Sequence, residues 1–240
     1  MQTLMASTRG SFNLWSGKKL KDKPIFITPK NKFQKLAKAQ EVVIFVHGMR
    51  NSTVGAKMGT NALRLRLRKL GYKHPIIGFS YDSNIRGAHL EKNYHKVLKT
   101  ATKIADENGE KLAGLINTIH KKNYHTIIRI VAHSLGCEVA KSACGRLGWN
   151  PIVSLHLFGS PLETKTIIDP FEFITAFNII NYYNPKDSVI IEGVERGELR
   201  EPSCLYDIDI KNATTNITSK RLYAKDHRFK SQMHALRSFP

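Results

Sequence analysis

Cysteine is scarce in this sequence. Its 240 residues include only Cys137, Cys144 and Cys204. Three cysteines are too few for a disulfide framework, and neither a Cys-x-x-Cys pair nor another metal-binding spacing occurs among them. We therefore expect a reducing compartment and no metal site.

Long apolar runs are also missing. No stretch approaches the roughly 18 apolar residues that cross a bilayer. Residues 1–15 show no charged region followed by an apolar one, as a secretory signal would. These absences predict a cytoplasmic protein that does not span a membrane.

Acidic residues are few, since 38 Lys and Arg face 19 Asp and Glu and give a formal charge of +19. Such a surface attracts polyanions, so peripheral contact with an anionic membrane is an expected partnership. Lysine is spread along the whole chain, without an arginine-rich block or a zinc-finger spacing. This pattern disfavours a nucleic-acid partner but does not exclude one. Nothing in the sequence indicates an oligomeric state.

The pattern of apolar residues predicts one α/β domain over residues 24–240, preceded by a basic, loose leader over residues 1–23. Apolar runs that alternate with helical periodicity indicate a mainly parallel sheet with helices on both faces. Residues 90–120 are expected to form one long helix, or two helices if Asn108-Gly109 interrupts it. The expected strands are 24–28, 41–46, 75–80, 125–131, 152–158, 177–182 and 205–210, and the expected helices are 61–70, 90–120 and 135–147.

One strand is followed by a nucleophile elbow, Ala132-His133-Ser134-Leu135-Gly136. The residues at 132 and 136 must be small because the sharp turn from strand to helix brings the backbone close to neighbouring strands. Ser134 then projects at the tip of the turn as a candidate nucleophile. The adjacent His133 is expected to point away from the tip and to be structural.

Acyl transfer also needs backbone donors for the negative charge that develops on the carbonyl oxygen. The amide that follows the nucleophile, Leu135 N–H, is the first candidate. The second comes from the turn after residues 41–46, where Met49 N–H is favoured and Arg50 N–H is an alternative.

The order Ser, acid, His along the chain restricts the remaining catalytic residues. Only His227 and His234 follow a suitable acid, and His227 is favoured because it lies in a polar turn, whereas His234 resembles part of a terminal helix. Asp187 is the favoured acid because it directly follows the strand at 177–182, with Glu192 as the alternative.

These residues together resemble the α/β-hydrolase superfamily, in particular its lipase and esterase-like serine hydrolases. The resemblance spans residues 40–190 and includes a strand that ends in His47-Gly48, the elbow at 132–136, the turn Gly159-Ser160-Pro161 and the turn at 184–187. It implies an α/β-hydrolase fold and ester hydrolysis through an acyl-enzyme, with Ser134, Asp187 and His227 as the triad.

The sequence thus predicts a serine carboxylester hydrolase that needs no cofactor and acts on an ester substrate, which could be a lipid. The alternative is a catalytically silent protein of the same fold that holds an anionic polymer or a membrane surface with its basic face. The net charge motivates that alternative.

Overall fold

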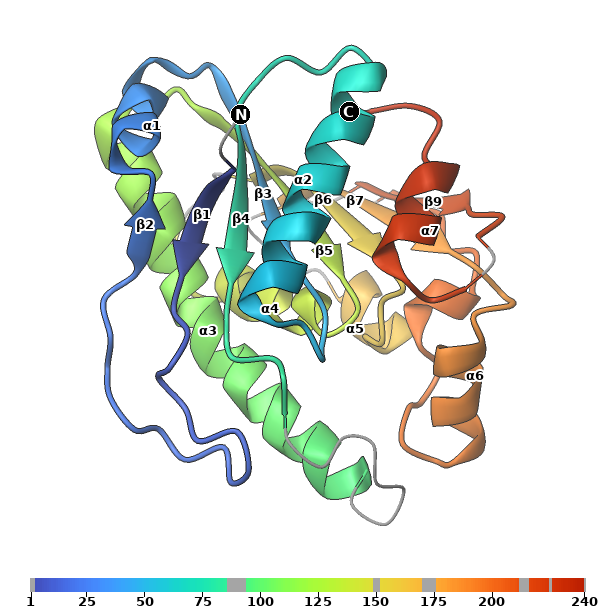
Figure 1. Ribbon diagram of the computed structural model, residues 1–240. Coiled ribbons are helices and arrows are strands. Elements are labelled where there is room, and N and C mark those ends of the chain that lie inside the picture. The colour runs from blue at the N-terminus through green and yellow to red at the C-terminus, as the bar shows by residue number, and fades with distance from the viewer. Residues whose placement is uncertain are drawn as a thin grey trace.

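The computed structural model describes residues 3–85, 94–148, 152–169, 176–211, 216–224 and 226–239. Its helices and strands run in the order expected for alternating α and β segments (Figure 1). The elements are β1 (Leu4–Ser7), β2 (Phe26–Thr28), α1 (Lys30–Gln34), η1 (Lys35–Lys38), β3 (Glu41–Val46), α2 (Thr53–Lys69), β4 (Ile76–Ser80), α3 (Tyr94–Lys122), β5 (Ile127–His133), α4 (Gly136–Cys144), β6 (Ile152–Phe158), α5 (Thr164–Ile168), β7 (Ala176–Tyr183), α6 (Ser188–Glu195), η3 (Ser203–Leu205), β8 (Ile210–Lys211), β9 (Asn216–Arg221) and α7 (Phe229–Ala235).

Within these described ranges, nine strands form one sheet in the order β2-β1-β4-β3-β5-β6-β7-β9-β8. The seven inner strands pair in parallel, and only the two outermost strands, β2 and β8, pair antiparallel with their neighbours. The carboxyl ends of the parallel strands therefore meet at one edge of the sheet, the lower edge in Figure 1. This edge is where open α/β sheets bind ligands.

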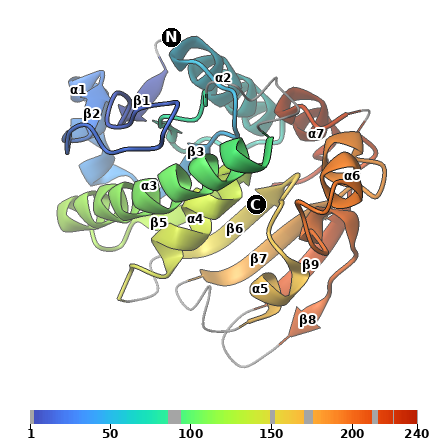
Figure 2. The ribbon, with the colours of Figure 1, turned by 90° about the horizontal axis from the view of Figure 1, so that it is seen from below.

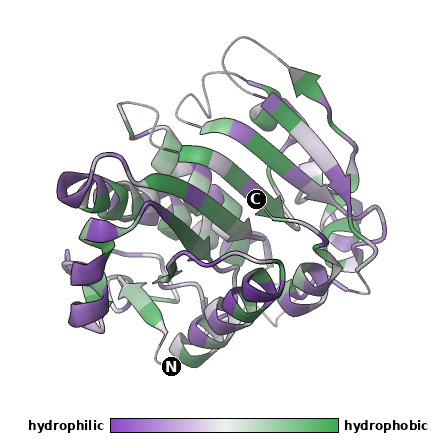
Figure 3. Ribbon diagram, turned by 90° about the horizontal axis from the view of Figure 1, so that it is seen from above, coloured by the Kyte–Doolittle hydropathy of each residue, from purple (hydrophilic) through white to green (hydrophobic). Residues whose placement is uncertain are grey.

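The central strands are buried on both faces, which explains their continuous apolar sequences. In β3, Val42, Ile44 and Val46 join one core with residues of α3 and α4, whereas Val43 and Phe45 join a second core with residues of α2 and α7. Figures 2 and 3 show this arrangement, with helices on both sides of predominantly hydrophobic central strands. The expected mainly parallel sheet between two helical layers is confirmed.

The long helix predicted after β4 is unbroken from residue 94 to residue 122, and its expected first residues, 90–93, lie outside the described part. Of the two alternatives, one continuous helix is correct, and Asn108-Gly109 does not interrupt it. Gly109 instead allows close helix packing, because a Cβ there would lie 2.2 Å from Ser142 Oγ of α4. A glycine inside a helix thus serves the contact between α3 and α4, not a turn.

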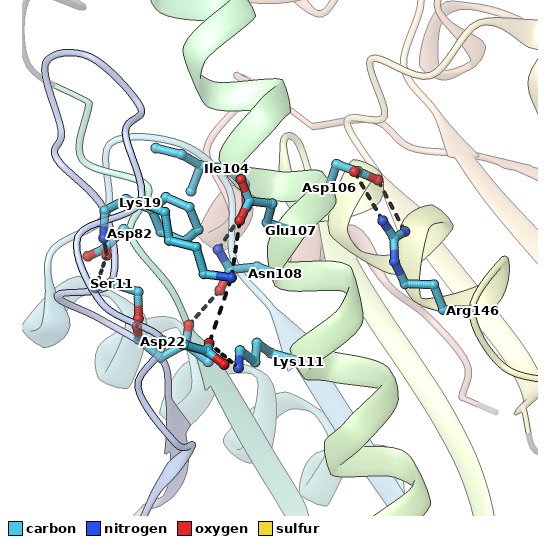
Figure 4. Close-up of polar contacts among 12 residues, drawn as sticks. Ser11, Lys19, Asp22, Asp82, Ile104, Asp106, Glu107, Asn108, Lys111 and Arg146 are labelled. Carbon is cyan, nitrogen blue, oxygen red and sulfur yellow. Dashed lines mark hydrogen bonds and ion pairs between the residues drawn. The ribbon is translucent and has the colours of Figure 1, made fainter.

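The N-terminal segment, expected as a loose leader, contributes β1 to the interior of the sheet, between β2 and β4. The residues that follow are held as well. The backbone amides of Gly10, Ser11 and Phe12 donate to the buried Asp82 carboxylate at 2.9–3.1 Å. Further along, Asp22 pairs with Lys111 of α3 (Figure 4). The expectation of a loose leader is therefore corrected for this segment.

The C-terminal part also differs from expectation. The strand predicted at residues 205–210 is irregular until β8, because the chain there bonds to a strand that the pattern did not reveal. Ile208 N–H donates to Ser219 Oγ of β9 at 2.8 Å. The alternating apolar residues thus belong to a loop that packs against β9, and the strand predicted at residues 205–210 is wrong up to residue 209.

A chain of polar side chains crosses four neighbouring strands on one face of the sheet, the face that packs against α2 and α7. Arg129 of β5 pairs with Glu41 of β3, with Nε 2.7 Å from Oε1. The Arg129 guanidinium also donates to Ser154 Oγ of β6 at 3.0 Å. That hydroxyl lies 3.0 Å from His156 Nε2, and His156 Nδ1 lies 3.2 Å from the Tyr182 hydroxyl of β7. Polar groups are therefore paired across an otherwise apolar layer.

Candidate active site

The nucleophile elbow lies where β5 ends and α4 begins. Ser134 has φ +53°, a left-handed conformation that is uncommon for residues other than glycine and is typical of a strained functional turn. Its amide donates to Phe158 O of β6 at 2.9 Å, which fixes the turn to the sheet. At Gly136 a Cβ would lie 2.4 Å from Val46 O, so this position must be glycine. The expected requirement for a small residue at 136 is confirmed.

His227 and Asp187, which are 40 positions apart, meet at the same edge of the sheet. His227 Nδ1 lies 2.8 Å from Asp187 Oδ2. The carboxylate is fully buried. It also accepts from Gln232 Nε2 at 3.0 Å and, as the N-cap of α6, from Ile190 N–H at 3.4 Å. These donors hold the carboxylate in one orientation, so it orients the imidazole.

A pocket of about 630 Å³ brings Ser134, His227 and Met49 together. Its volume is within the range of small-molecule sites. Charges of both signs line the rest of the wall, where Glu192 pairs with Arg196. The pocket therefore places the candidate nucleophile, the candidate base with its carboxylate partner, and a backbone turn around one space.

A family model described as "Alpha/beta hydrolase of unknown function (DUF900)" matches residues 28–156, more than half of the chain. The chain belongs to this family. No curated protein matches this hydrolase. Among solved structures, Trichoderma reesei cutinase in complex with a phosphonate inhibitor is similar at 16% identity over 70% of each chain, with a TM-score of 0.40. The catalytic core domain of acetyl xylan esterase from the same organism has 10% identity over 75% of this chain and 82% of that chain, with a TM-score of 0.38.

The turn after β3 packs directly against Ser134, the candidate nucleophile of this hydrolase. A Cβ at Gly48 would lie 2.8 Å from the Cβ of Ser134, so only glycine lets the turn approach. Arg50 N–H already donates to Ser83 O at 2.7 Å, which removes it as a donor to an oxyanion. Met49, which lines the pocket, remains the candidate from this turn, beside Leu135 at the start of α4.

His47 supports this turn from behind. Its Nε2 lies 3.2 Å from Arg9 Nη2, a donor, and its Nδ1 lies 2.9 Å from Gly48 O, so the proton is assigned to Nδ1. The ring stacks on Tyr81, whose hydroxyl donates to His47 O at 3.0 Å. Burial, with a contribution from the Arg9 charge, lowers the pKa of His47 to about 3, so this imidazole is neutral. Arg9 was not expected here, because the segment that carries it was interpreted as a leader.

His133 is structural, as expected, and it also contacts the candidate base. Its Nε2–H donates to the backbone oxygen of His227 at 2.8 Å, and the two ring centroids are 5.0 Å apart. Burial, with a contribution from His227, lowers the pKa of His133 to about 3. A neutral His133 thus holds the loop that carries His227.

The alternative residues lie in less suitable places. His234 is exposed on α7 and lines a different hollow, which shares no described lining residue with the pocket of Ser134. Glu192 lines the pocket but forms an ion pair with Arg196. The geometry therefore favours His227 and Asp187 over both alternatives.

Sequence reasoning missed two residues that position Asp187 and His227, the candidate acid and base. Gln232 donates to Asp187 from the inner side of α7, and its only signal was a polar residue inside a short amphipathic helix. Gly159 has φ +53°, and a Cβ there would lie 2.8 Å from His227 Cε1. The Gly-Ser-Pro motif marked this position, but the motif alone did not indicate what the glycine touches.

Across the described ranges, no group of three or more His, Cys, Asp or Glu side chains is arranged to hold a metal ion. In the same part of the chain, no helix is both long enough and apolar enough to cross a membrane.

Proposed function

We propose that this α/β hydrolase is a serine esterase that cleaves carboxylic esters through an acyl-enzyme. His227 Nε2 removes the proton from Ser134 Oγ as the oxygen attacks the ester carbonyl carbon. The backbone amides of Met49 and Leu135 stabilise the oxyanion. His227 then protonates the leaving alcohol, and a water that it activates hydrolyses the acyl-enzyme.

One observation carries the proposal. The 2.8 Å hydrogen bond between His227 Nδ1 and Asp187 Oδ2 leaves His227 Nε2 for proton transfer, and His227 lines the same pocket as Ser134. A buried carboxylate in this position stabilises the imidazolium that forms during attack.

Labelling with a fluorophosphonate tests the nucleophile. We expect one adduct, located on Ser134 by peptide mass spectrometry, and turnover of p-nitrophenyl esters that Ser134→Ala abolishes. Ser188→Ala is the matched control, because Ser188 lines the same pocket and its loss should leave the adduct in place. If the folded protein carries no adduct on Ser134, the catalytically silent alternative replaces the esterase.

A panel of p-nitrophenyl esters with acyl chains of increasing length would narrow the substrate. A pocket of about 630 Å³ has room for a short or medium acyl chain. Glu192, Arg196 and other charged groups line its wall, which favours short acyl groups over long apolar ones. We expect kcat/KM to fall as the chain lengthens, and a steady rise would refute this assignment.

A further inference from the structure

A second hollow lies outside the candidate active site. It has a volume of about 420 Å³ and lies where α2, β9, α7 and the residues after α7 converge. Basic side chains from each of these elements reach it. They are Arg66 from α2, Lys220 and Arg221 from β9, His234 from α7, and Arg237.

No carboxylate occurs among the described residues that line this hollow. The active-site pocket differs, since Glu192, Glu198 and Asp226 balance its arginines. In a protein with a formal charge of +19, a concave site with four Lys and Arg side chains concentrates positive potential. Such a site attracts an anion.

One of the guanidinium groups is held in place before any ligand arrives. Arg66 donates through Nε to Leu236 O at 3.0 Å, and its Nη2 donates to the same oxygen. Both hydrogen bonds use the Nε–Nη2 edge of Arg66, so this group loses little entropy on binding and offers its Nη1 side to a phosphate oxygen. Arg221 lies over the ring of Tyr223, 5.2 Å from its centroid. The planar forks of Arg221 and Arg237 can match two oxygens of a phosphate group.

The hollow is larger than one phosphate group requires and is within the volume range of small-molecule sites. Tyr223 also exposes 75% of its surface beside the basic groups, so an organic part of a ligand has an aromatic face to pack on. We propose that this hollow binds a small phosphorylated molecule, whose phosphate oxygens bridge α2, β9 and α7.

Isothermal titration with inorganic pyrophosphate in 0.15 M NaCl tests the site. We expect one-site binding together with a rise in Tm, because a ligand that binds only the folded state stabilises it. The double variant Lys220→Gln/Arg237→Gln should weaken binding at least about tenfold. Both side chains are exposed, so the Tm of this variant without ligand should match the wild type.

The matched control is Lys99→Gln/Lys121→Gln. It removes the same two charges from exposed positions on α3, across the sheet from the hollow. This control should bind pyrophosphate as the wild type does. Absence of pyrophosphate binding, or equal weakening in the two double variants, would overturn the proposal, because the charge would then act only as a diffuse surface.

Vesicles distinguish the two sources of a phosphate group. The whole basic surface attracts anionic vesicles. Phosphatidylcholine vesicles that contain phosphatidic acid therefore report on this hollow only through the part of their binding that depends on it, which is present if the site takes a lipid headgroup. In that case pyrophosphate and Lys220→Gln/Arg237→Gln should both reduce vesicle binding. Pyrophosphate binding without that part of vesicle binding would assign the site to a free phosphorylated molecule.

Discussion

Gly159 offers the sharpest test of how this fold seats its candidate base. The change Gly159→Ala adds one methyl group at a residue with φ +53°. That methyl carbon would lie 2.8 Å from His227 Cε1, 3.0 Å from Gln232 Nε2 and 3.1 Å from His227 Nδ1. The substitution therefore strains the backbone, and its methyl group also clashes with the His227 imidazole, which is hydrogen-bonded to Asp187.

The two effects have different magnitudes. A left-handed conformation costs an alanine about 1–2 kcal/mol. Carbon atoms in contact normally lie about 3.5–4.0 Å apart, so the His227 ring must move by at least about 0.7 Å. A displacement of about 1 Å costs up to about 100-fold in rate. We expect Gly159→Ala to lower kcat/KM roughly 10- to 100-fold and to lower the free energy of unfolding by at least about 1–2 kcal/mol.

Gly71→Ala separates these effects. Gly71 also has a positive φ, +89°, but nothing lies within 4 Å of a Cβ built there. This control should lose about 1–2 kcal/mol of stability through strain and keep its turnover of p-nitrophenyl esters. Urea unfolding and steady-state kinetics on both variants provide the comparison. If Gly159→Ala lost stability like Gly71→Ala but kept the wild-type kcat/KM, Gly159 would not seat His227.

The remaining predictions concern the acid, the buried histidines and the elbow. Asp187→Asn should lower kcat about 10⁴-fold by stabilising the wrong tautomer of His227, while the fold survives; an unchanged rate would reassign the acid. His47 and His133 have pKa values lowered from 6.5 to about 3. Below pH 6.5 the unfolded chain therefore binds protons that the folded protein does not. Each histidine should lower the free energy of unfolding by about 2 kcal/mol between pH 7 and pH 5. Denaturant titration at both pH values measures this loss. Gly136→Ala should lower the free energy of unfolding by about 1–3 kcal/mol because its methyl group meets backbone oxygens. Gly114→Ala should raise Tm, because Gly114 lies in the middle of α3 and nothing is within 4 Å of a Cβ there. A more stable Gly136→Ala than Gly114→Ala would contradict the packing argument.

The sequence predicted the central strands well because their signal is local. β3 and β6 have the predicted bounds, because both consist mainly of apolar residues that need burial on two faces. β1 and β9 carry much weaker signals. β1 is a four-residue Leu-Met-Ala-Ser segment, and β9 reads Asn-Ile-Thr-Ser-Lys-Arg with only Ile217 buried. Both are strands because of their neighbours in the sheet, which a local pattern does not contain.

The residues of the candidate site also fall into two groups, those that the sequence indicated and those that it did not. The positions of Ser134, Asp187 and His227 follow from strand ends and from their order along the chain, which the sequence displays. Gln232 and Gly159 matter because of atoms 45 and 68 positions away, and such contacts exist only once the sheet has formed. Chain order thus indicates the reacting groups, whereas the residues that support them require the three-dimensional structure.

The polar chain through the sheet has a consequence for how this hydrolase folds. If β5 slipped by two residues against β3, every apolar side chain would stay on its own face, so hydrophobic burial distinguishes such registers poorly. The same slip would separate Arg129 from Glu41 and leave largely buried charges without their partners, at a cost of about 3–5 kcal/mol. Ser154 and His156 extend the same requirement to β6. These polar groups therefore discriminate against misaligned sheets that an entirely apolar layer would tolerate.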